Sequence, residues 1–227
     1  MDVLTTIPFE LDTPQLLRRA HLAAGSADAA EFARMVDTAR AVARPKAGYR
    51  EAFIDGKGED TVTIAGITFT SRMLRQNLDQ AERVFAYIVT CGRELDGHAP
   101  PAGEFLEEFW WDLIKAEVLT AGIQFLLEHL NHRYRLPKTA TMHPGSGDAD
   151  VWPIEQQRPL FALLGDVRGE LGVELTESCL MVPNKTISGI RFATELDFRS
   201  CQVCQRAVCP NRAAAFDEAL WASIQHE

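Results

Sequence analysis

The sequence lacks the features of several large classes of protein. Its 23 basic and 32 acidic side chains give a formal charge of −9, and no stripe of Lys and Arg is concentrated enough to hold a nucleic acid. No window approaches the roughly 20 apolar residues that cross a bilayer, and the first residues lack the basic region and long apolar core of a secretory signal. We therefore expect a cytoplasmic protein that has neither a nucleic acid nor a membrane as its partner.

The usual motifs of catalysis and nucleotide binding are missing as well. The sequence has no nucleophile elbow, no P-loop and no dinucleotide fingerprint, and it contains no internal repeat or low-complexity segment. Its 227 residues, 46% of them hydrophobic, are enough to bury a substantial core. We expect one domain, in which residues 1–200 form the main unit with helices over 13–44 packed on it. Residues 201–227 add a cysteine cluster and a final helix to the same domain.

Apolar spacing predicts both helices and strands. Capping residues and a spacing of three to four residues predict helices capped by Thr13 and by Ser26, and further helices over 71–78, about 103–134, 154–164 and from Asn211. Alternation around Ala65-Gly66 predicts a small hairpin, and a continuous apolar run over 83–90 predicts a strand buried on both faces. Two further strands, over 173–182 and 185–193, are expected to be antiparallel partners.

The longest expected helix, over about 103–134, is the backbone of the predicted core. Its apolar face repeats at helical spacing and comprises Phe109, Leu113, Ala116, Leu119, Ile123, Leu126 and Leu130. Trp110 and Trp111 broaden that face, and we expect them to pack in the core rather than against a cofactor. Gly122 costs roughly 1 kcal/mol relative to alanine in a helix interior, so we expect a neighbour close to the backbone there.

The strand expected over 173–182 carries a possible site. Alternation places Glu177 and Cys179 on one face of it. Glu177 is either a buried carboxylate held by backbone or hydroxyl donors, or a residue that binds a cationic or hydroxyl-bearing ligand. Gly189 in the partner strand leaves room for a close neighbour. His143, in a turn-rich loop, has the chemistry of a ligand or proton carrier, although a lone loop histidine usually serves as neither.

Three cysteines form a dense cluster near the end of the sequence. Cys201, Cys204 and Cys209 make a C-x2-C-x4-C run, and Pro210 follows it. Five cysteines in a reducing compartment are not a disulfide framework, and the two-residue gap lets two sulfurs reach one metal ion. Candidates for the fourth ligand are Cys179, Cys91, a histidine or an external molecule. An iron–sulfur cluster, zinc and metal-free thiols all remain open.

Several segments of the central stretch, over 141–192, recur in one known family in the same order and at similar spacing. They are Pro144-Gly145, Gly147-Asp148, Trp152-Pro153-Ile154-Glu155-Gln156-Gln157, Leu171-Gly172-Val173, Leu175-Thr176-Glu177-Ser178, Met181-Val182-Pro183 and Ser188-Gly189. With them the stretch resembles the reactivation domain of cobalamin-dependent methionine synthase and the small stand-alone proteins related to it. The match covers about 50 residues, and it extends more loosely to the strand over 84–92 and the long helix.

The resemblance implies an α+β fold, with a bent antiparallel sheet flanked by helices. It further implies that S-adenosylmethionine binds as methyl donor, with Pro144 and Gly145 in its site. Glu177, singled out above from its place on the expected strand, is a further candidate for binding the cofactor. A corrinoid protein or the subunit of a cobalamin-dependent methyltransferase is the implied partner, so cobalamin would be held only by that partner. The implied role is to restore inactive cob(II)alamin by reductive methylation.

Two departures from the family keep a second function open. The family commonly has an arginine where Thr141 stands and an aromatic residue where Ser146 stands. One alternative is an accessory protein that docks on a corrinoid protein and assists its reactivation, with an iron–sulfur centre as a plausible one-electron donor. The other is a metal-binding scaffold or electron-transfer protein that has lost S-adenosylmethionine. A homodimer is compatible with both.

Overall fold

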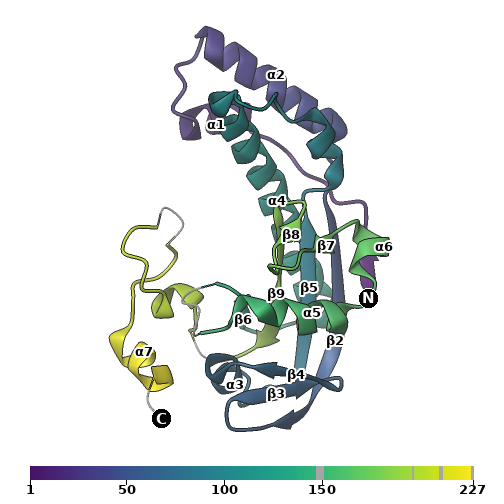
Figure 1. The fold of residues 1–227 in the computed structure, drawn as a ribbon, viewed down its shortest axis with the longest axis vertical. Helices are drawn as coiled ribbons and strands as arrows, with labels where there is room; N and C mark the ends of the chain where they lie inside the picture. The colour runs from purple at the N-terminus through teal and green to yellow at the C-terminus, as the bar shows by residue number, and fades with distance from the viewer. Residues whose placement is uncertain (147–150, 196, 210–211, 226–227) are drawn as a thin grey trace.

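The chain folds around one large antiparallel sheet. The computed structural model describes residues 1–146, 151–195, 197–209 and 212–225. The sheet has the strand order β4-β3-β2-β5-β9-β6, with β1 beside β2, and all of its pairs are antiparallel. A separate hairpin is formed by β7 and β8. Helices flank the sheet on both faces (Figure 1), so the predicted α+β architecture is confirmed.

The elements of this fold have the following bounds. The strands of the large sheet are β1 (Asp2–Leu4), β2 (Lys46–Lys57), β3 (Thr61–Ile64), β4 (Ile67–Thr70), β5 (Arg83–Thr90), β6 (Thr139–Met142) and β9 (Thr186–Ala193). The hairpin strands are β7 (Glu174–Leu175) and β8 (Met181–Val182). The helices are α1 (Thr13–Arg19), α2 (Ala27–Val42), α3 (Arg72–Asn77), α4 (Phe105–Tyr134), α5 (Gln157–Leu164), α6 (Val167–Leu171) and α7 (Glu218–Gln225), with 3-10 turns η1 (Arg93–His98), η2 (Ile154–Gln156) and η3 (Ser200–Val203).

The central strand β5 explains how the layers are held together. Its side chains alternate between the two faces: Val84, Ala86 and Ile88 pack towards α3 and α5, whereas Phe85, Tyr87 and Val89 pack towards the C-terminal half of α4. All but one of its residues are buried, which accounts for the continuous apolar run of its sequence. Beyond the sheet, α1, α2 and the N-terminal half of α4 enclose a further apolar cluster.

The long helix has the predicted bounds, and its C-terminal half buries the predicted face through Leu126 and Leu130, whereas its N-terminal half buries a neighbouring stripe. Phe109 is 55% exposed, while the stripe that contains Trp111, Ile114 and Val118 is buried. The helix is apolar over much of its circumference, so its own sequence does not select the stripe; contact with α2 at one end and β5 at the other does. Gly122 has the predicted close neighbour, since a Cβ there would lie 2.9 Å from the Val89 side chain. Trp110 and Trp111 are buried in the core, as predicted.

The strand predicted over 173–182 is wrong. Thr176 turns the chain back: its N–H donates to Leu180 O at 2.8 Å, and its hydroxyl accepts from Leu180 N at 3.0 Å. Cys179 has a φ of 61° within this turn. As a result Glu177 is exposed and Cys179 is buried, so the two do not share a strand face. The predicted pairing of 173–182 with 185–193 is also wrong, because β9 pairs with β5 and β6.

Smaller differences concern the ends of elements. The cap of α1 is Asp12, whose carboxylate accepts from Gln15 N, and not Thr13. The last helix begins at Glu218, where Asp217 accepts from Leu220 N at 3.0 Å, and not at Asn211. The strands β2 and β6 were not predicted. The helix capped by Ser26, the hairpin at Ala65-Gly66 and the strand over 83–90 are confirmed. No helix in the described residues is both long and apolar enough to cross a bilayer.

Candidate functional site

The segments that carry the family resemblance meet at the loop that follows β6. Gly145 donates its N–H to Trp152 O at 2.8 Å, and Gln157 Nε2 donates to Pro144 O at 3.5 Å. The Ser188 hydroxyl donates to Gln157 Oε1 at 2.6 Å, which ties α5 to β9. Two separate stretches of sequence, residues 152–157 and β9, therefore hold the Pro144-Gly145 loop in place. Gly147 and Asp148, which belong to the same motif, lie outside the described residues.

Other residues of the motif support the loop from inside the protein. Trp152 is buried and packs its ring edge-on against Phe69, with ring centroids 6.2 Å apart. Gln156 accepts a hydrogen bond from Thr70 N at 2.9 Å. Gly145 has a φ of +79°, a conformation that favours glycine. The segment from Trp152 to Gln157 thus acts mainly as a scaffold for the loop. In the loop that it supports, Gly145 is exposed to solvent.

On the face of the sheet that packs against α4, polar side chains form two neighbouring rows. In the first row Tyr87 lies opposite Gly189, and the ring of His143 fills the space above that glycine. A Cβ on Gly189 would lie 2.4 Å from Met142 O and 2.7 Å from His143 Nδ1, so the predicted close neighbour is the loop itself. His143 Nδ1 lies 3.0 Å from Ser188 O, and the His143 and Tyr87 rings meet edge to face.

In the second row Arg191 lies between Phe85 on β5 and Thr141 on β6. Arg191 Nη2 donates to Asn131 Oδ1 on α4 at 2.9 Å. Its Nε is buried without a hydrogen-bond partner among the described residues. Sequence reasoning missed Arg191, although an arginine in a strand of otherwise apolar and small residues was a visible signal.

Burial sets the charges of these groups. It lowers the pKa of His143, with the Ser188 carbonyl opposing the shift, so the imidazole is neutral at neutral pH. Burial also raises the pKa of Tyr87, which keeps the phenol protonated. Burial lowers the pKa of Arg191 as well, but a guanidinium stays charged in proteins. The two rows therefore hold one cation surrounded by neutral polar groups.

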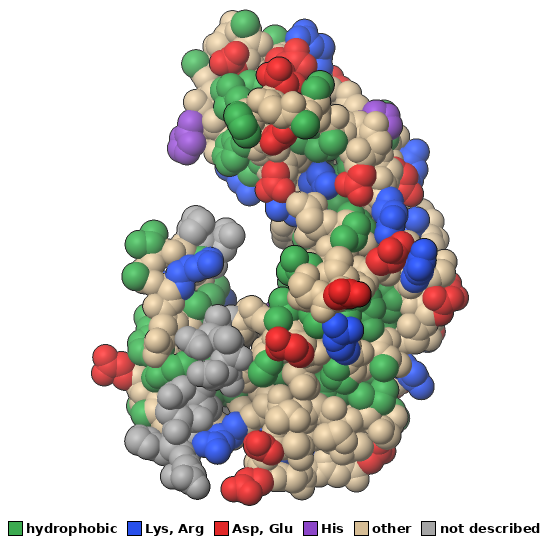
Figure 2. All heavy atoms as spheres, viewed as in Figure 1, with side chains coloured by type: hydrophobic (Ala, Val, Ile, Leu, Met, Phe, Trp, Pro, Cys, Tyr) green, Lys and Arg blue, Asp and Glu red, His purple; other side chains and the backbone are tan. Residues whose placement is uncertain are grey.

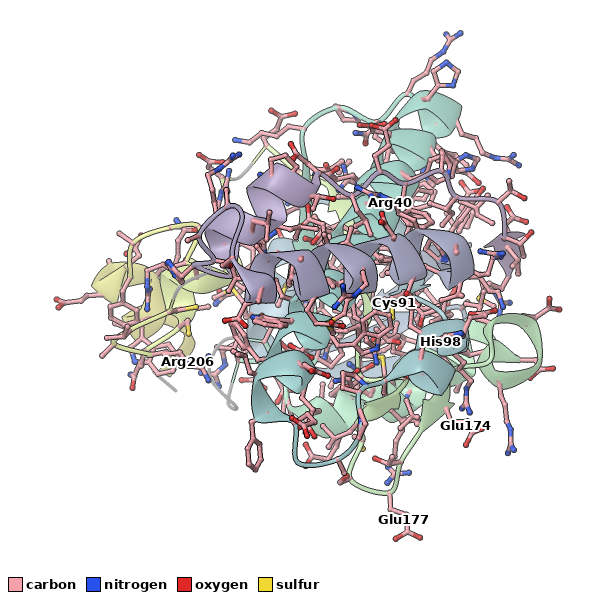
Figure 3. The ribbon with its side chains drawn as sticks, turned by 90° about the horizontal axis from the view of Figure 1, so that it is seen from above. Arg40, Cys91, His98, Glu174, Glu177 and Arg206 are labelled. Carbon is pink, nitrogen blue, oxygen red and sulfur yellow. The ribbon has the colours of Figure 1, made fainter. Side chains whose placement is uncertain are left out.

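The other predicted site residues lie elsewhere. Glu177 is exposed at the turn between β7 and β8 and points away from the molecule (Figure 3). The interpretation of Glu177 as a buried carboxylate is therefore wrong, whereas its role in ligand binding stays a prediction. Arg158 Nη2 donates to the Glu177 carbonyl at 2.6 Å, but the carboxylate itself has no partner among the described residues.

The cysteine cluster forms a loop that is closed by a cation. Arg212 donates to the carbonyls of Cys201 and Cys204, at 3.3 and 3.4 Å, and to that of Arg206. Cys201, Cys204 and Cys209 are half-buried free thiols, and Cys179 is a buried one. In the part of the chain that the structure describes, no group of three or more His, Cys, Asp or Glu side chains is placed to hold a metal. The metal ligands therefore stay a prediction.

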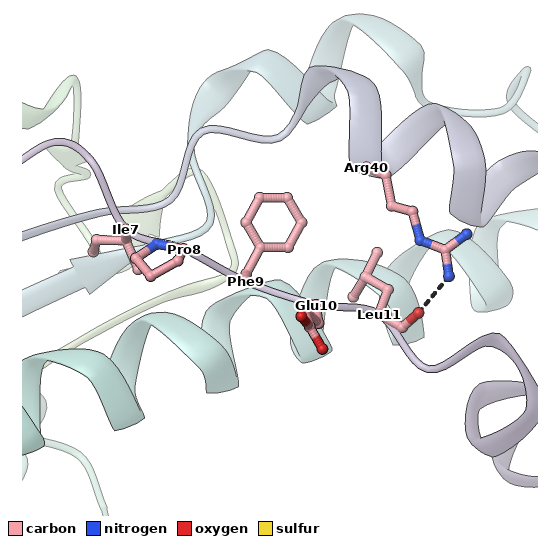
Figure 4. A pocket seen from close by; sticks show the side chains of 6 residues that line it. All are labelled: Ile7, Pro8, Phe9, Glu10, Leu11 and Arg40. Atoms are coloured by element: carbon pink, nitrogen blue, oxygen red, sulfur yellow. Dashed lines mark hydrogen bonds between the residues drawn. The ribbon is translucent and has the colours of Figure 1, made fainter.

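Two surface features complete the description. Figure 2 shows a deep hollow between the end of the molecule that carries α1 and α2 and the segment that leads to α7. A separate depression of about 570 Å³ runs along the N-terminal segment from Ile7 to Leu11 (Figure 4), where Arg40 donates to the Leu11 carbonyl. None of the predicted site residues lines this depression.

Comparison with known proteins identifies the fold. No protein-family model and no curated protein matches the sequence. Among solved structures, the crystal structure of the MetH reactivation domain bound to AdoHcy superposes with a TM-score of 0.60 and 15% sequence identity. The match covers 88% of this chain and 81% of that domain. The fold predicted from the resemblance is therefore confirmed.

Proposed function

We propose that this protein is an accessory of a cobalamin-dependent methyltransferase system: it binds an S-adenosyl ligand, docks on a corrinoid protein and assists the reductive reactivation of cob(II)alamin. In that reaction cob(II)alamin accepts one electron from an outside reductant and a methyl group from S-adenosylmethionine, which leaves as S-adenosylhomocysteine. The observation that supports this function best is the match over 88% of the chain to a reactivation domain with AdoHcy bound.

The geometry of the loop after β6 supports the ligand-binding part of the proposal. Gly145 is exposed and has no side chain, so a ligand can approach its backbone closely. Pro144 is held by Gln157 and Gly145 by Trp152, which fixes the loop before a ligand arrives. Pro144 and Gly145 are the proposed ligand loop, in which Gly145 offers the exposed backbone and Pro144, which is buried, fixes its position. The unpartnered carboxylate of Glu177 is a further proposed contact for a cationic or hydroxyl-bearing group.

Exposed apolar side chains support the docking part. Phe105, Leu106 and Phe109 are exposed at the start of α4, and Leu180 and Val182 are exposed on the β7–β8 hairpin. An ion pair of 2.8 Å between Asp112 and Lys185 joins the first turns of α4 to the loop that follows this hairpin. Clustered apolar side chains on adjoining elements mark interaction surfaces more often than isolated ones do. The proposed occupant of this surface is the corrinoid-carrying domain of the partner.

A titration tests docking. Corrinoid proteins from the same organism are titrated with the wild-type chain, and the spectral conversion of cob(II)alamin to methylcobalamin is followed with S-adenosylmethionine and a reductant. We expect saturable binding that the double substitution Phe105→Asp and Phe109→Asp weakens at least tenfold. Phe53→Asp is the control, because the exposure of Phe53 (59%) is close to that of Phe109 (55%) but Phe53 lies on β2. Absence of binding to every corrinoid protein of that organism would sink the proposal.

The cysteine loop is a proposed electron donor with a separate test. Cys201, Cys204 and Cys209 are half-buried and carry free thiols, so a metal could gather them only if their loop rearranged. Iron and sulfide at about four per chain after anaerobic purification would support a cluster of the [4Fe–4S] type, and one zinc per chain would support a structural site. The alternative function, a metal-binding scaffold without an S-adenosyl ligand, requires bound metal and no affinity for S-adenosylhomocysteine.

A further inference from the structure

Arg191 is a buried cation whose charge the described part of the chain does not balance. Its side chain is only 7% exposed, and Nη2 binds the neutral amide oxygen of Asn131. No carboxylate pairs with it, and its Nε has no partner among the described residues. Burying a charge without a counter-charge is costly, and an anion bound beside it would offset that cost. An unpartnered guanidinium nitrogen is therefore an unfilled position for an anion.

The groups around Arg191 are suited to a carboxylate. The hydroxyls of Tyr87 and Thr141 belong to the same polar cluster, and Thr141 is the register partner of Arg191 on β6. Among the described residues of the cluster no acid pairs with the guanidinium, and His143 is neutral because burial lowers its pKa. Nη2 of Arg191 is bound to Asn131, so the unpartnered Nε marks the edge that remains for a carboxylate, and a planar guanidinium edge can bind a carboxylate through two parallel hydrogen bonds.

The cluster is reachable from solvent on one side. The strand β6 is the last in the described sheet, Thr141 is half-buried on it, and Asn131 is exposed on α4. Across an antiparallel pair, opposed residues have Cβ atoms about 5 Å apart. The guanidinium of Arg191 can thus reach the same space as a long side chain at position 141 would reach, because the two residues are register partners.

We propose that Arg191 binds the carboxylate of a ligand that carries an amino-acid group. Arg191, on β9, would then take the place of the arginine that the family commonly has at the position of Thr141 on β6. This inference rests on the proposed function where it takes the ligand to be an S-adenosyl amino acid. The nucleoside part of that ligand would then lie towards the Pro144-Gly145 loop, which follows Thr141 on the same segment.

Calorimetry with two ligands tests the assignment. S-adenosylhomocysteine carries the carboxylate, whereas 5′-methylthioadenosine has the same nucleoside and thioether without the amino-acid group. We expect Arg191→Met to weaken S-adenosylhomocysteine about ten- to hundredfold, as loss of a hydrogen bond to a charged group does, and to leave 5′-methylthioadenosine unchanged. Arg191→Met keeps an unbranched side chain and removes the buried charge, so we expect the variant to fold, which circular dichroism checks. Arg18→Met, on the exposed side of α1, is the control.

The outcomes separate this inference from the proposed function. If S-adenosylhomocysteine binds the wild type and Arg191→Met equally well, Arg191 is not the receptor and the proposed function stands. If S-adenosylhomocysteine does not bind the wild type, the ligand part of the proposed function fails. The inference about Arg191 is then tested by NMR, with L-methionine added at millimolar concentration as the carboxylate ligand. A shift of the Arg191 Nε–H resonance with methionine, identified by its loss in Arg191→Met, supports a carboxylate receptor; no shift overturns it.

Discussion

The Ser188 hydroxyl donates a hydrogen bond of 2.6 Å to Gln157 Oε1, and both side chains are buried. Ser188 lies on β9 and Gln157 begins α5, so the bond joins two elements that are 31 residues apart. Gln157 also donates to Pro144 O at 3.5 Å. This one amide therefore connects the sheet, the helix above it and the proposed ligand loop.

Replacing Gln157 is expected to damage both stability and ligand binding. In Gln157→Ala the Ser188 hydroxyl is left buried and unsatisfied, which costs about 1–3 kcal/mol, and the Pro144 carbonyl loses its donor. Urea unfolding should show the lost stability, and calorimetry should show weaker binding of S-adenosylhomocysteine. Gln80→Ala, on an exposed glutamine, should change neither. A Gln157→Ala protein with wild-type stability would contradict the role given to this amide.

A methyl group at Gly189 is expected to separate β6 from β9. The added Cβ would lie 2.4 Å from the Met142 carbonyl and 2.7 Å from His143 Nδ1, and backbone cannot move aside easily. We expect Gly189→Ala to lower the free energy of unfolding by about 3 kcal/mol, at the upper end of overpacking effects. Gly56→Ala is the control within a strand, because a Cβ there meets nothing within 4 Å. Similar losses for the two variants would refute the close approach.

Stability is expected to fall in acid partly because of His143. Burial holds its pKa below the ordinary value of 6.5, so between these two values the unfolded chain binds a proton that the folded chain does not. Stability therefore rises with pH in this window and is lost as pH falls below about 6.5, by up to roughly 1.4 kcal/mol per pH unit. Unfolding measured at pH 7.5 and 5.5 should show a smaller pH dependence in His143→Gln. His132→Gln, on an exposed histidine, should retain the wild-type dependence.

The cysteine loop is expected to open locally when Arg212 is replaced. Arg212 binds the carbonyls of Cys201, Cys204 and Arg206, so Arg212→Met removes three closing contacts at once. Hydrogen exchange of the amides in 204–209 should become at least roughly tenfold faster, because each such bond contributes about 1 kcal/mol. Arg206→Met is the matched control, since the Arg206 side chain is exposed. Unchanged exchange in Arg212→Met would show that other contacts close this loop.

The sequence predicts most strongly those elements whose pattern is local. The run over 83–90 is apolar at successive positions, and a strand covered on both faces follows from it. Ser26 and Ser71 cap the helices predicted after them. The turn at Thr176 is different, because alternation over 173–182 fits a strand as well as a hairpin. Hydrogen bonds of the Thr176 hydroxyl and backbone decide between them, and they place Glu177 in solvent.

The sequence by itself determined the fold and the motif of the ligand loop. The motif is readable because the Pro144-Gly145 segment and residues 152–157 lie close in sequence and contact each other. Only the tertiary structure decided that Arg191 lies buried beside Thr141. That neighbourhood depends on the register between β6 and β9, which are more than 40 residues apart. A shift of one residue would turn Arg191 to the other face of the sheet, so the local pattern could mark this arginine as unusual but could not place it beside Thr141.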